Sequence, residues 1–150
     1  MTIELTSADV PQEDDLAKVR LVLEGIAAGL WNTQDLADKS GVSRRHVGYG
    51  INAAIVLGWV VEGEEQLEVT PAGQALLAQA KGTPEERAEL KKGVETSPAL
   101  KEIAPDLLGE PAPTRVLLGE RICAATGLSK STGERRAQAL LAWRRQVLAK

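Results

Sequence analysis

The sequence has 150 residues, a formal net charge of −3 and 43% hydrophobic residues, with no Phe among them. A chain of this length forms one domain or two small ones, which excludes a large multidomain enzyme. Ala, Leu and Val dominate the apolar residues, and β-branched runs are confined to two short stretches. This composition favours packed helices over sheets.

Several classes of protein are excluded by what the sequence lacks. No apolar run approaches the roughly 20 residues that span a bilayer, and the acidic start does not resemble a secretory signal, so we expect a cytoplasmic protein without membrane contact. Because Cys123 and His46 are the only residues of their kinds, neither a disulfide within the chain nor a metal site is expected. The sequence also has no Gly-rich phosphate loop, paired-carboxylate site or nucleophile–base pair, so we expect no enzymatic activity and no cofactor.

Basic residues concentrate near the C-terminal end. Residues 115–150 hold eight Lys and Arg residues against Glu120 and Glu134, whereas the first 75 residues are strongly acidic. The basic end favours contact with nucleic acid. The alternative is a solvated helix face that balances an acidic surface of the same fold.

The first part of the chain predicts a helix followed by a helix-turn-helix. After a flexible acidic segment over residues 1–13, an apolar stripe over 14–28 has helical spacing. Thr33 is expected to cap a short helix, Gly41 permits a tight turn, and Ser43 caps a longer helix over residues 44–57.

Two short β-prone runs come next, on either side of residues 63–65, and predict a hairpin. Thr70 and Pro71 then begin another helix. A hairpin that follows a helix-turn-helix is a wing, so residues 14–82 are predicted to form a winged-helix domain.

Residues 83–150 are predicted to form a helical domain with a second helix-turn-helix. Thr83 and Ser97 each precede a Pro that starts a helix, and residues 109–114 form a Pro-rich linker. Beyond the linker we expect a helix over 115–125, a turn at Gly127, a cap at Ser129 and a long helix over 130–147. The fold class is therefore mainly α with a small β-wing: a winged helix followed by a second, wingless helix-turn-helix unit.

The two helix-turn-helix segments form an internal repeat. A shift of 86 residues superposes Gly127-Leu128-Ser129 on Gly41-Val42-Ser43. The apolar stripes of the two long helices correspond as well. Their members are Val47, Ile51, Ala54 and Ile55 in the first helix and Gly133, Ala137, Leu140 and Leu141 in the second.

The opposite faces of the long helices carry side chains that can contact DNA. Arg pairs with guanine and Asn or Gln with adenine in the major groove, while Ser and Tyr contact bases or phosphates. The predicted base-reading residues are Arg45, Tyr49, Asn52, Ser131, Arg135 and Gln138. The predicted phosphate contacts are Ser43, Arg44, His46, Ser129, Lys130, Thr132, Arg136, Arg144 and Arg145.

A few residues have competing interpretations. His46 could contact a phosphate, sense pH or cover the turn. Cys123 falls in a short helix that must pack closely on its neighbour, so we interpret it as a core residue instead of a nucleophile. Trp31, Trp59 and Trp143 are predicted to anchor the core instead of stacking on bases.

The predicted wing is acidic, which is unusual for a DNA contact. It carries Glu62, Glu64, Glu65 and Glu68, all of which a phosphate backbone would repel. Either the wing points away from DNA, or the first unit binds something else.

Two stretches of the sequence resemble known bacterial proteins. LEVTPAGQALL resembles the end of bacterial winged-helix regulators, and TSPALKEI with GLSKSTGERRAQALLAWRRQVL resembles the helical region after a winged helix in proteins associated with restriction enzymes, ATPases and defence systems. The matching positions are Gly127, Leu128, Ser129, Ser131, Thr132, Arg135, Arg136, Ala137, Leu140, Leu141 and Trp143; Gly133 stands where we expect Ala. The resemblance implies DNA binding and no particular reaction.

These observations lead to two functional hypotheses. The first is a double-stranded DNA-binding protein, either a sequence-selective transcription regulator or the DNA-targeting component of a bacterial defence or replication system, with its two long helices in successive segments of the major groove. The alternative is an adaptor whose acidic winged helix docks a basic partner protein. A second copy in a homodimer and a larger protein assembly are further partners that fit either hypothesis.

Overall fold

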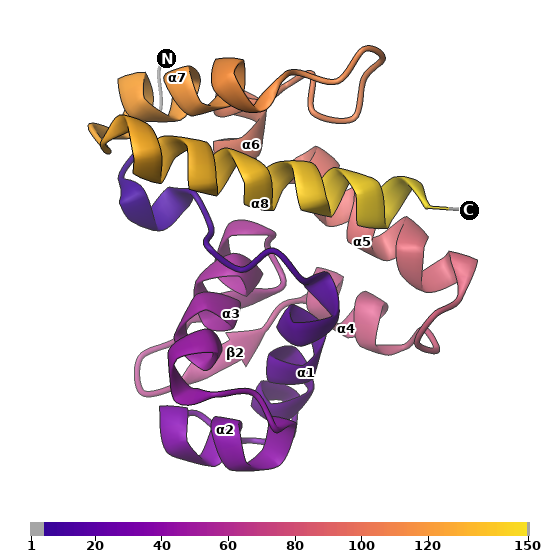
Figure 1. Ribbon diagram of the computed structural model, residues 1–150. Coiled ribbons are helices and arrows are strands. Elements are labelled where there is room, and N and C mark those ends of the chain that lie inside the picture. Colours follow the sequence, from indigo (N-terminus) through magenta and orange to yellow (C-terminus); the bar gives the residue numbers. More distant parts are fainter. Residues whose placement is uncertain (1–4, 150) are drawn as a thin grey trace.

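The computed structural model describes residues 5–149, which form a mainly helical fold with a small two-stranded antiparallel sheet (Figure 1). At this coarse level the predicted fold class is confirmed. The elements are a 3-10 turn η1 (Ser7–Asp9), α1 (Leu16–Ala27), α2 (Thr33–Ser40), α3 (Arg44–Val56), β1 (Val60–Glu62), β2 (Leu67–Val69), α4 (Pro71–Leu77), α5 (Pro84–Thr96), α6 (Pro98–Ile103), α7 (Arg115–Thr126) and α8 (Lys130–Leu148).

Local hydrogen bonds set where the first helices begin and end. The Ser43 hydroxyl accepts from the backbone N–H of His46 at the start of α3, as the cap was predicted. For α2 the cap is Asn32, whose side chain accepts from the N–H of Asp35 at 2.8 Å, and Thr33 is instead the first helical residue. Each such cap stabilises its helix by about 1 kcal/mol.

The small sheet leads from α3 into α4. Val60 pairs with Val69 and Glu62 with Leu67 in antiparallel register. The hydroxyl of Thr70 donates to the Gly58 carbonyl at 2.6 Å and caps α4, so the hairpin is tied to the helices before and after it.

In the second half of the chain, α7 and α8 pack closely because glycines line their contact. A Cβ added at Gly133 would lie 2.5 Å from Cys123 Sγ and 2.9 Å from the carbonyl oxygen of Gly119. Gly133 therefore stands where Ala was expected because the neighbouring backbone leaves no room for a methyl group. Cys123 itself is partly buried at this contact.

The turn between α2 and α3 and the turn between α7 and α8 have the same geometry. Gly41 and Gly127 both adopt the left-handed conformation, with φ of 76° and 77°. The residues before them, Ser40 and Thr126, each donate a side-chain hydrogen bond of 2.6 Å to the carbonyl four residues earlier. The repeat seen in the sequence thus extends to the hydrogen bonds of the turn.

The N-terminal segment differs from its prediction. We expected a flexible segment over residues 1–13, but in the described part, residues 5–13, Leu5, Val10 and Glu13 are buried. Residues 1–4 lie outside the described residues. We call residues 5–14 the N-terminal strap, because this segment runs between α3 and α8 (Figure 1).

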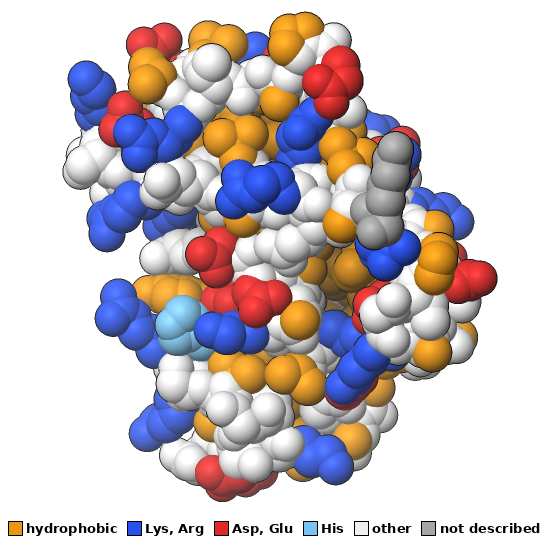
Figure 2. Space-filling view, turned by 45° about the vertical axis from the view of Figure 1, so that its right-hand side comes forward, with side chains coloured by type: hydrophobic (Ala, Val, Ile, Leu, Met, Phe, Trp, Pro, Cys, Tyr) orange, Lys and Arg blue, Asp and Glu red, His pale blue; other side chains and the backbone are white. Residues whose placement is uncertain are grey.

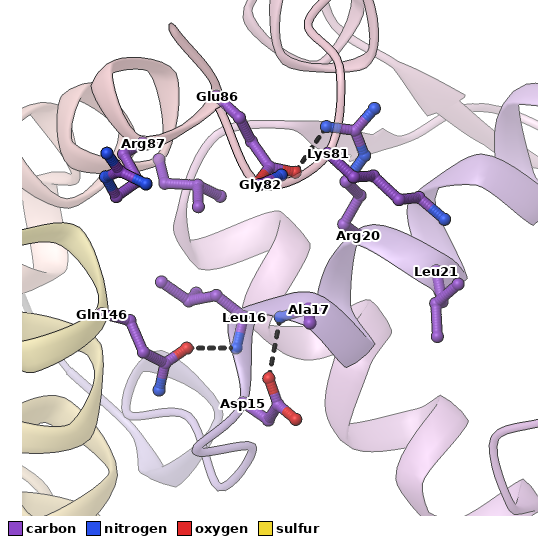
Figure 3. Close-up of a pocket in the computed structure, with 11 residues that line it drawn as sticks. Asp15, Leu16, Ala17, Arg20, Leu21, Lys81, Gly82, Glu86, Arg87 and Gln146 are labelled. Atoms are coloured by element: carbon purple, nitrogen blue, oxygen red, sulfur yellow. Dashed lines mark hydrogen bonds and ion pairs between the residues drawn. The ribbon is translucent and has the colours of Figure 1, made fainter. Parts of the chain in front are cut away.

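The strap also joins the two halves of the fold to each other. The indole N–H of Trp143 donates to the carbonyl of Glu13 at 2.8 Å, and the Gln146 amide donates to the carbonyl of Asp14 at 2.6 Å. The Gln146 carbonyl oxygen accepts from the N–H of Leu16 at the start of α1, as Figure 3 shows. The buried apolar residues of both halves accordingly form one continuous cluster.

A half-open pocket of about 460 Å³ lies beside this joint (Figure 3). Its buried arginine, Arg20, forms ion pairs with Glu86 at 2.5 Å and Glu24 at 3.2 Å and donates to the Gln79 carbonyl. These partners occupy the charged group, so Arg20 links α1 to α5.

The three tryptophans divide into two groups. Trp59 and Trp143 are buried, as predicted, whereas the side chain of Trp31 is 58% exposed. Trp31 follows α1 in the loop that leads to α2, beside the hairpin loop and outside the core.

Candidate nucleic-acid interface

The clearest candidate surface is a stripe of exposed polar side chains along α8. Ser131, Arg135, Gln138 and Arg145 are all exposed and recur at the spacing that places residues on one helical face. Lys130 is exposed at the first position of the helix. Three of the predicted base-reading residues therefore share one accessible face.

The corresponding face of α3 is accessible only in its first half. Arg45 is exposed, and its Nε donates to the hydroxyl of Tyr49 at 2.8 Å, which is the main reason why the pKa of Arg45 is raised. The ring of Tyr49 also meets His46 edge-on at 5.4 Å. Arg44 is exposed beside them.

Asn52, the third predicted base-reading residue of α3, is occupied by the strap. Its amide nitrogen donates to the carbonyl of Ala8 at 2.6 Å. Bidentate recognition of adenine needs both the donor and the acceptor of the amide. The structure therefore places one N–H donor of Asn52 in a contact within the protein, and its role in base reading stays a prediction.

His46 is likewise engaged with the strap. Its Nδ1 lies 2.9 Å from Oε2 of Glu13, whose side chain is only 1% exposed against 42% for the histidine. The other carboxylate oxygen, Oε1, is buried without a hydrogen-bond partner in the described chain. The contact ties the His46 ring to the strap, and the three interpretations of His46 stay predictions.

Two arginines predicted to contact phosphate hold parts of the fold together instead. Arg136 donates to the carbonyls of Ser7 and Val10 in the strap, and Arg144 donates to the Gly109 carbonyl and pairs with Glu110 at 2.5 Å. The pKa of Arg136 is lowered, mainly by partial burial. Both arginines are only partly exposed and already have partners within the described chain, and their contact with phosphate stays a prediction.

The predicted phosphate contacts at the helix starts serve local roles. The hydroxyls of Ser43 and Ser129 accept backbone N–H groups as caps, and Thr132 Oγ1 accepts from the Arg135 guanidinium at 3.3 Å.

Within residues 5–149, no ion pair involves the exposed cations of these helices, which are Arg44, Arg45, Lys130, Arg135 and Arg145.

The strap links α3 to α8. Asn52 on α3 and Arg136 on α8 donate to the carbonyls of Ala8 and Ser7, which are consecutive residues. His46 on α3 and Trp143 on α8 likewise both contact Glu13 in the strap. Lys and Arg side chains lie on either side of His46 in the space-filling view (Figure 2). We define the α3–α8 face by Arg44, Arg45, Tyr49, Lys130, Ser131, Arg135 and Gln138.

Sequence reasoning missed the strap as part of this surface. The stretch Thr6 to Asp9 forms a capping box in which the Asp9 carboxylate accepts from the N–H of Thr6 at 2.8 Å. That spacing is a recognised start signal for a helical turn and could have marked local order. No local signal pairs the strap carbonyls with Asn52 or Arg136.

The hairpin forms a separate, acidic surface. Its four glutamates, Glu62, Glu64, Glu65 and Glu68, are all exposed. A hollow of about 260 Å³ lies between the hairpin loop and Trp31. Val61, on β1, is 47% exposed.

Comparison of the chain with protein-family models, curated proteins and solved structures finds no match. The resemblance to bacterial DNA-handling proteins therefore stays a prediction. The fold defines a helix-rich protein with a small antiparallel sheet and with turns of the same geometry at Gly41 and Gly127. Among residues 5–149, no helix has both the length and the apolar character needed to span a membrane.

Proposed function

We propose that the protein binds double-stranded DNA through the α3–α8 face. In this proposal the first unit is a winged helix, the second is a wingless helix-turn-helix, and α8 lies in the major groove. The observation that carries the proposal is the exposed row of Ser131, Arg135 and Gln138 along a helix that follows a tight glycine turn. An α-helix fits the major groove, where arginine and amide side chains distinguish base pairs.

Charge supports this choice of surface. The exposed cations of the α3–α8 face have no ion-pair partner in the described chain, so phosphate groups can neutralise them without breaking an existing pair. The acidic hairpin would then point away from the duplex. The physiological role that fits is a cytoplasmic, sequence-selective regulator or a DNA-targeting component of a defence or replication assembly, with no reaction of its own.

Fluorescence anisotropy with a labelled random duplex of about 30 base pairs tests the proposal. We expect binding that weakens steeply with salt and that Arg135→Ala reduces about fivefold or more. The matched control is Arg115→Ala, which removes another exposed arginine, on α7 outside the α3–α8 face, and should leave binding nearly unchanged. Absence of duplex binding at low salt contradicts the proposal.

The acidic hairpin favours a second candidate function, an adaptor that docks a basic partner. The specific observation is the exposed indole of Trp31, which lines the same hollow as the exposed residues Glu62, Glu64 and Glu65. A cationic side chain can stack on an indole and meet carboxylates at the same time.

A labelled arginine-rich peptide tests the adaptor function. Because Trp59 and Trp143 are buried, a change in tryptophan emission on binding would report mainly on Trp31. Trp31→Ala should abolish peptide binding, whereas Val116→Ala, at an exposed apolar side chain on α7, should not. Displacement of the peptide by a duplex would count against the adaptor function. Unchanged binding of the peptide to the Trp31→Ala variant would count against it as well.

A further inference from the structure

The spacing of the two long helices bears on how they would meet DNA. Two reading helices that occupy successive major-groove segments on one side of a duplex lie about 34 Å apart. Here Asn52 and Arg136 bind the carbonyls of Ala8 and Ser7, and consecutive Cα atoms are only about 3.8 Å apart. The middle of α3 and the second turn of α8 are therefore neighbours, too close for successive grooves.

The short distance between α3 and α8 also applies to residues that occupy equivalent positions in the repeat. Tyr49 and Arg135 correspond under the shift of 86 residues and would occupy matching places in two separate grooves. The ring of Tyr49 instead meets His46 edge-on at 5.4 Å, and His46 contacts Glu13, whose carbonyl accepts from Trp143 of α8. Both positions therefore belong to one local surface.

The two helices also differ in how much of their outer face is free. On α8 the stripe is exposed at Ser131, Arg135, Gln138 and Arg145 and partly buried at Ala142. On α3 it closes after Tyr49, because Asn52 is bonded to the strap and Val56 is only 9% exposed. The accessible face of α8 is therefore longer than that of α3, which is confined to the first turns of the helix.

We propose that the two helices have different roles on a single stretch of DNA, a division in which α8 reads bases with Ser131, Arg135 and Gln138. The start of α3 contacts the flanking phosphates. Arg44 and Arg45 supply the phosphate contacts, at the positive end of the α3 dipole. The strap, which is held by Arg136, sets the distance between α8, which reads the bases, and α3, which contacts the phosphates. This inference rests on the proposed DNA-binding function and replaces the expectation of two equivalent reading helices.

The division predicts different responses to mutation on the two helices. A preferred duplex is first selected with the wild-type protein, and affinity is then measured for it and for its single-base variants over a range of salt concentrations. Arg135→Ala and Gln138→Ala should each reduce discrimination about tenfold at one base pair. Arg44→Ala and Arg45→Ala should weaken binding to all duplexes equally and lower the salt slope by about 1.

Hydroxyl-radical footprinting of the same complex supplies a second readout. The inference predicts one continuous protected stretch, whereas two equivalent reading helices predict two protected stretches about one helical turn apart. Each variant is compared with the wild type by circular dichroism and thermal unfolding, which should be unchanged because the four side chains are exposed.

Two results would overturn the division while leaving DNA binding intact. One is a change of base preference in Arg44→Ala or Arg45→Ala, and the other is a footprint in two separated stretches. Failure of the wild-type protein to bind any duplex would instead overturn the proposed function itself, and the division with it.

Discussion

His46 on α3 and Glu13 in the N-terminal strap form a contact of 2.9 Å between Nδ1 and Oε2, in which the carboxylate is buried and the imidazole is partly exposed. Within residues 5–149 this histidine is the only side chain that bonds the carboxylate, whose other oxygen has no partner. The contact links α3 to the segment that also bonds α8 through Trp143.

Removal of the His46 side chain should therefore destabilise the fold, because the buried Glu13 carboxylate loses its hydrogen-bond partner. We expect His46→Ala to lower the free energy of unfolding by about 1–3 kcal/mol, because a buried acceptor loses its partner. Combined with Glu13→Gln, which removes the charge, the loss should be smaller than the sum of the single effects. Urea unfolding of the four proteins in this double-mutant cycle measures the difference, and strict additivity would contradict the prediction.

Arg136 should stabilise the fold through the strap. Arg136→Ala leaves the Val10 carbonyl without its side-chain donor and removes one of the two donors to the Ser7 carbonyl, so it should cost about 1–3 kcal/mol of unfolding free energy. Amide hydrogen exchange should accelerate in residues 5–10. Arg135→Ala is the matched control, because that side chain is exposed and its loss should change stability by less than about 0.5 kcal/mol. Equal effects of the two variants would show that the strap does not depend on Arg136.

Gly133 and Gly48 provide a matched pair of glycines within helices. Ala stabilises an exposed helix position by up to about 1 kcal/mol relative to Gly, and a Cβ at Gly48 meets nothing within 4 Å, so Gly48→Ala should stabilise. At Gly133 the added methyl would lie against Cys123 and the backbone of Gly119, so Gly133→Ala should destabilise by about 1–3 kcal/mol. Thermal unfolding measures both, and a stabilising Gly133→Ala would show that α7 can move away from α8.

The ion pair between Asp106 and Arg121 predicts a pH dependence. The hydrogen bonds from Arg121, at 2.7 and 3.1 Å, lower the pKa of Asp106 below its usual value of 3.8. A lowered folded-state pKa means that the pair stabilises the fold above pH 3.8 and that this contribution is lost as the pH falls through the folded-state pKa. Because both side chains are partly exposed, the contribution is about 0.5 kcal/mol.

Comparison of Asp106→Asn with the wild type tests this pH dependence. The difference in unfolding free energy should be present at about pH 7 and shrink toward about pH 2. Glu102→Gln is the control, since Glu102 is exposed and forms no ion pair within residues 5–149. A difference that grows on acidification would contradict the sign of the Asp106 shift.

The sequence by itself determined the features that depend on neighbours along the chain. The turns at Gly41 and Gly127, the caps at Ser43 and Ser129, and the hairpin before Thr70 follow from residues a few positions apart, whose hydrogen bonds form within one or two turns. The 86-residue repeat and the exposed face of α8 could be predicted for the same reason, since helical periodicity is a local property.

Only the tertiary structure decided which side chains of the candidate site are free. In the sequence, Asn52 is as good a candidate DNA contact as Gln138, and Arg136 is as good as Arg135. In the structure, Asn52 and Arg136 are bound to the strap, whereas Gln138 and Arg135 are exposed. Their partners are backbone carbonyls 44 and 129 residues away. Every residue offers such a carbonyl, so nothing in the sequence marks which ones a side chain will meet; the packing of the strap between α3 and α8 selects them.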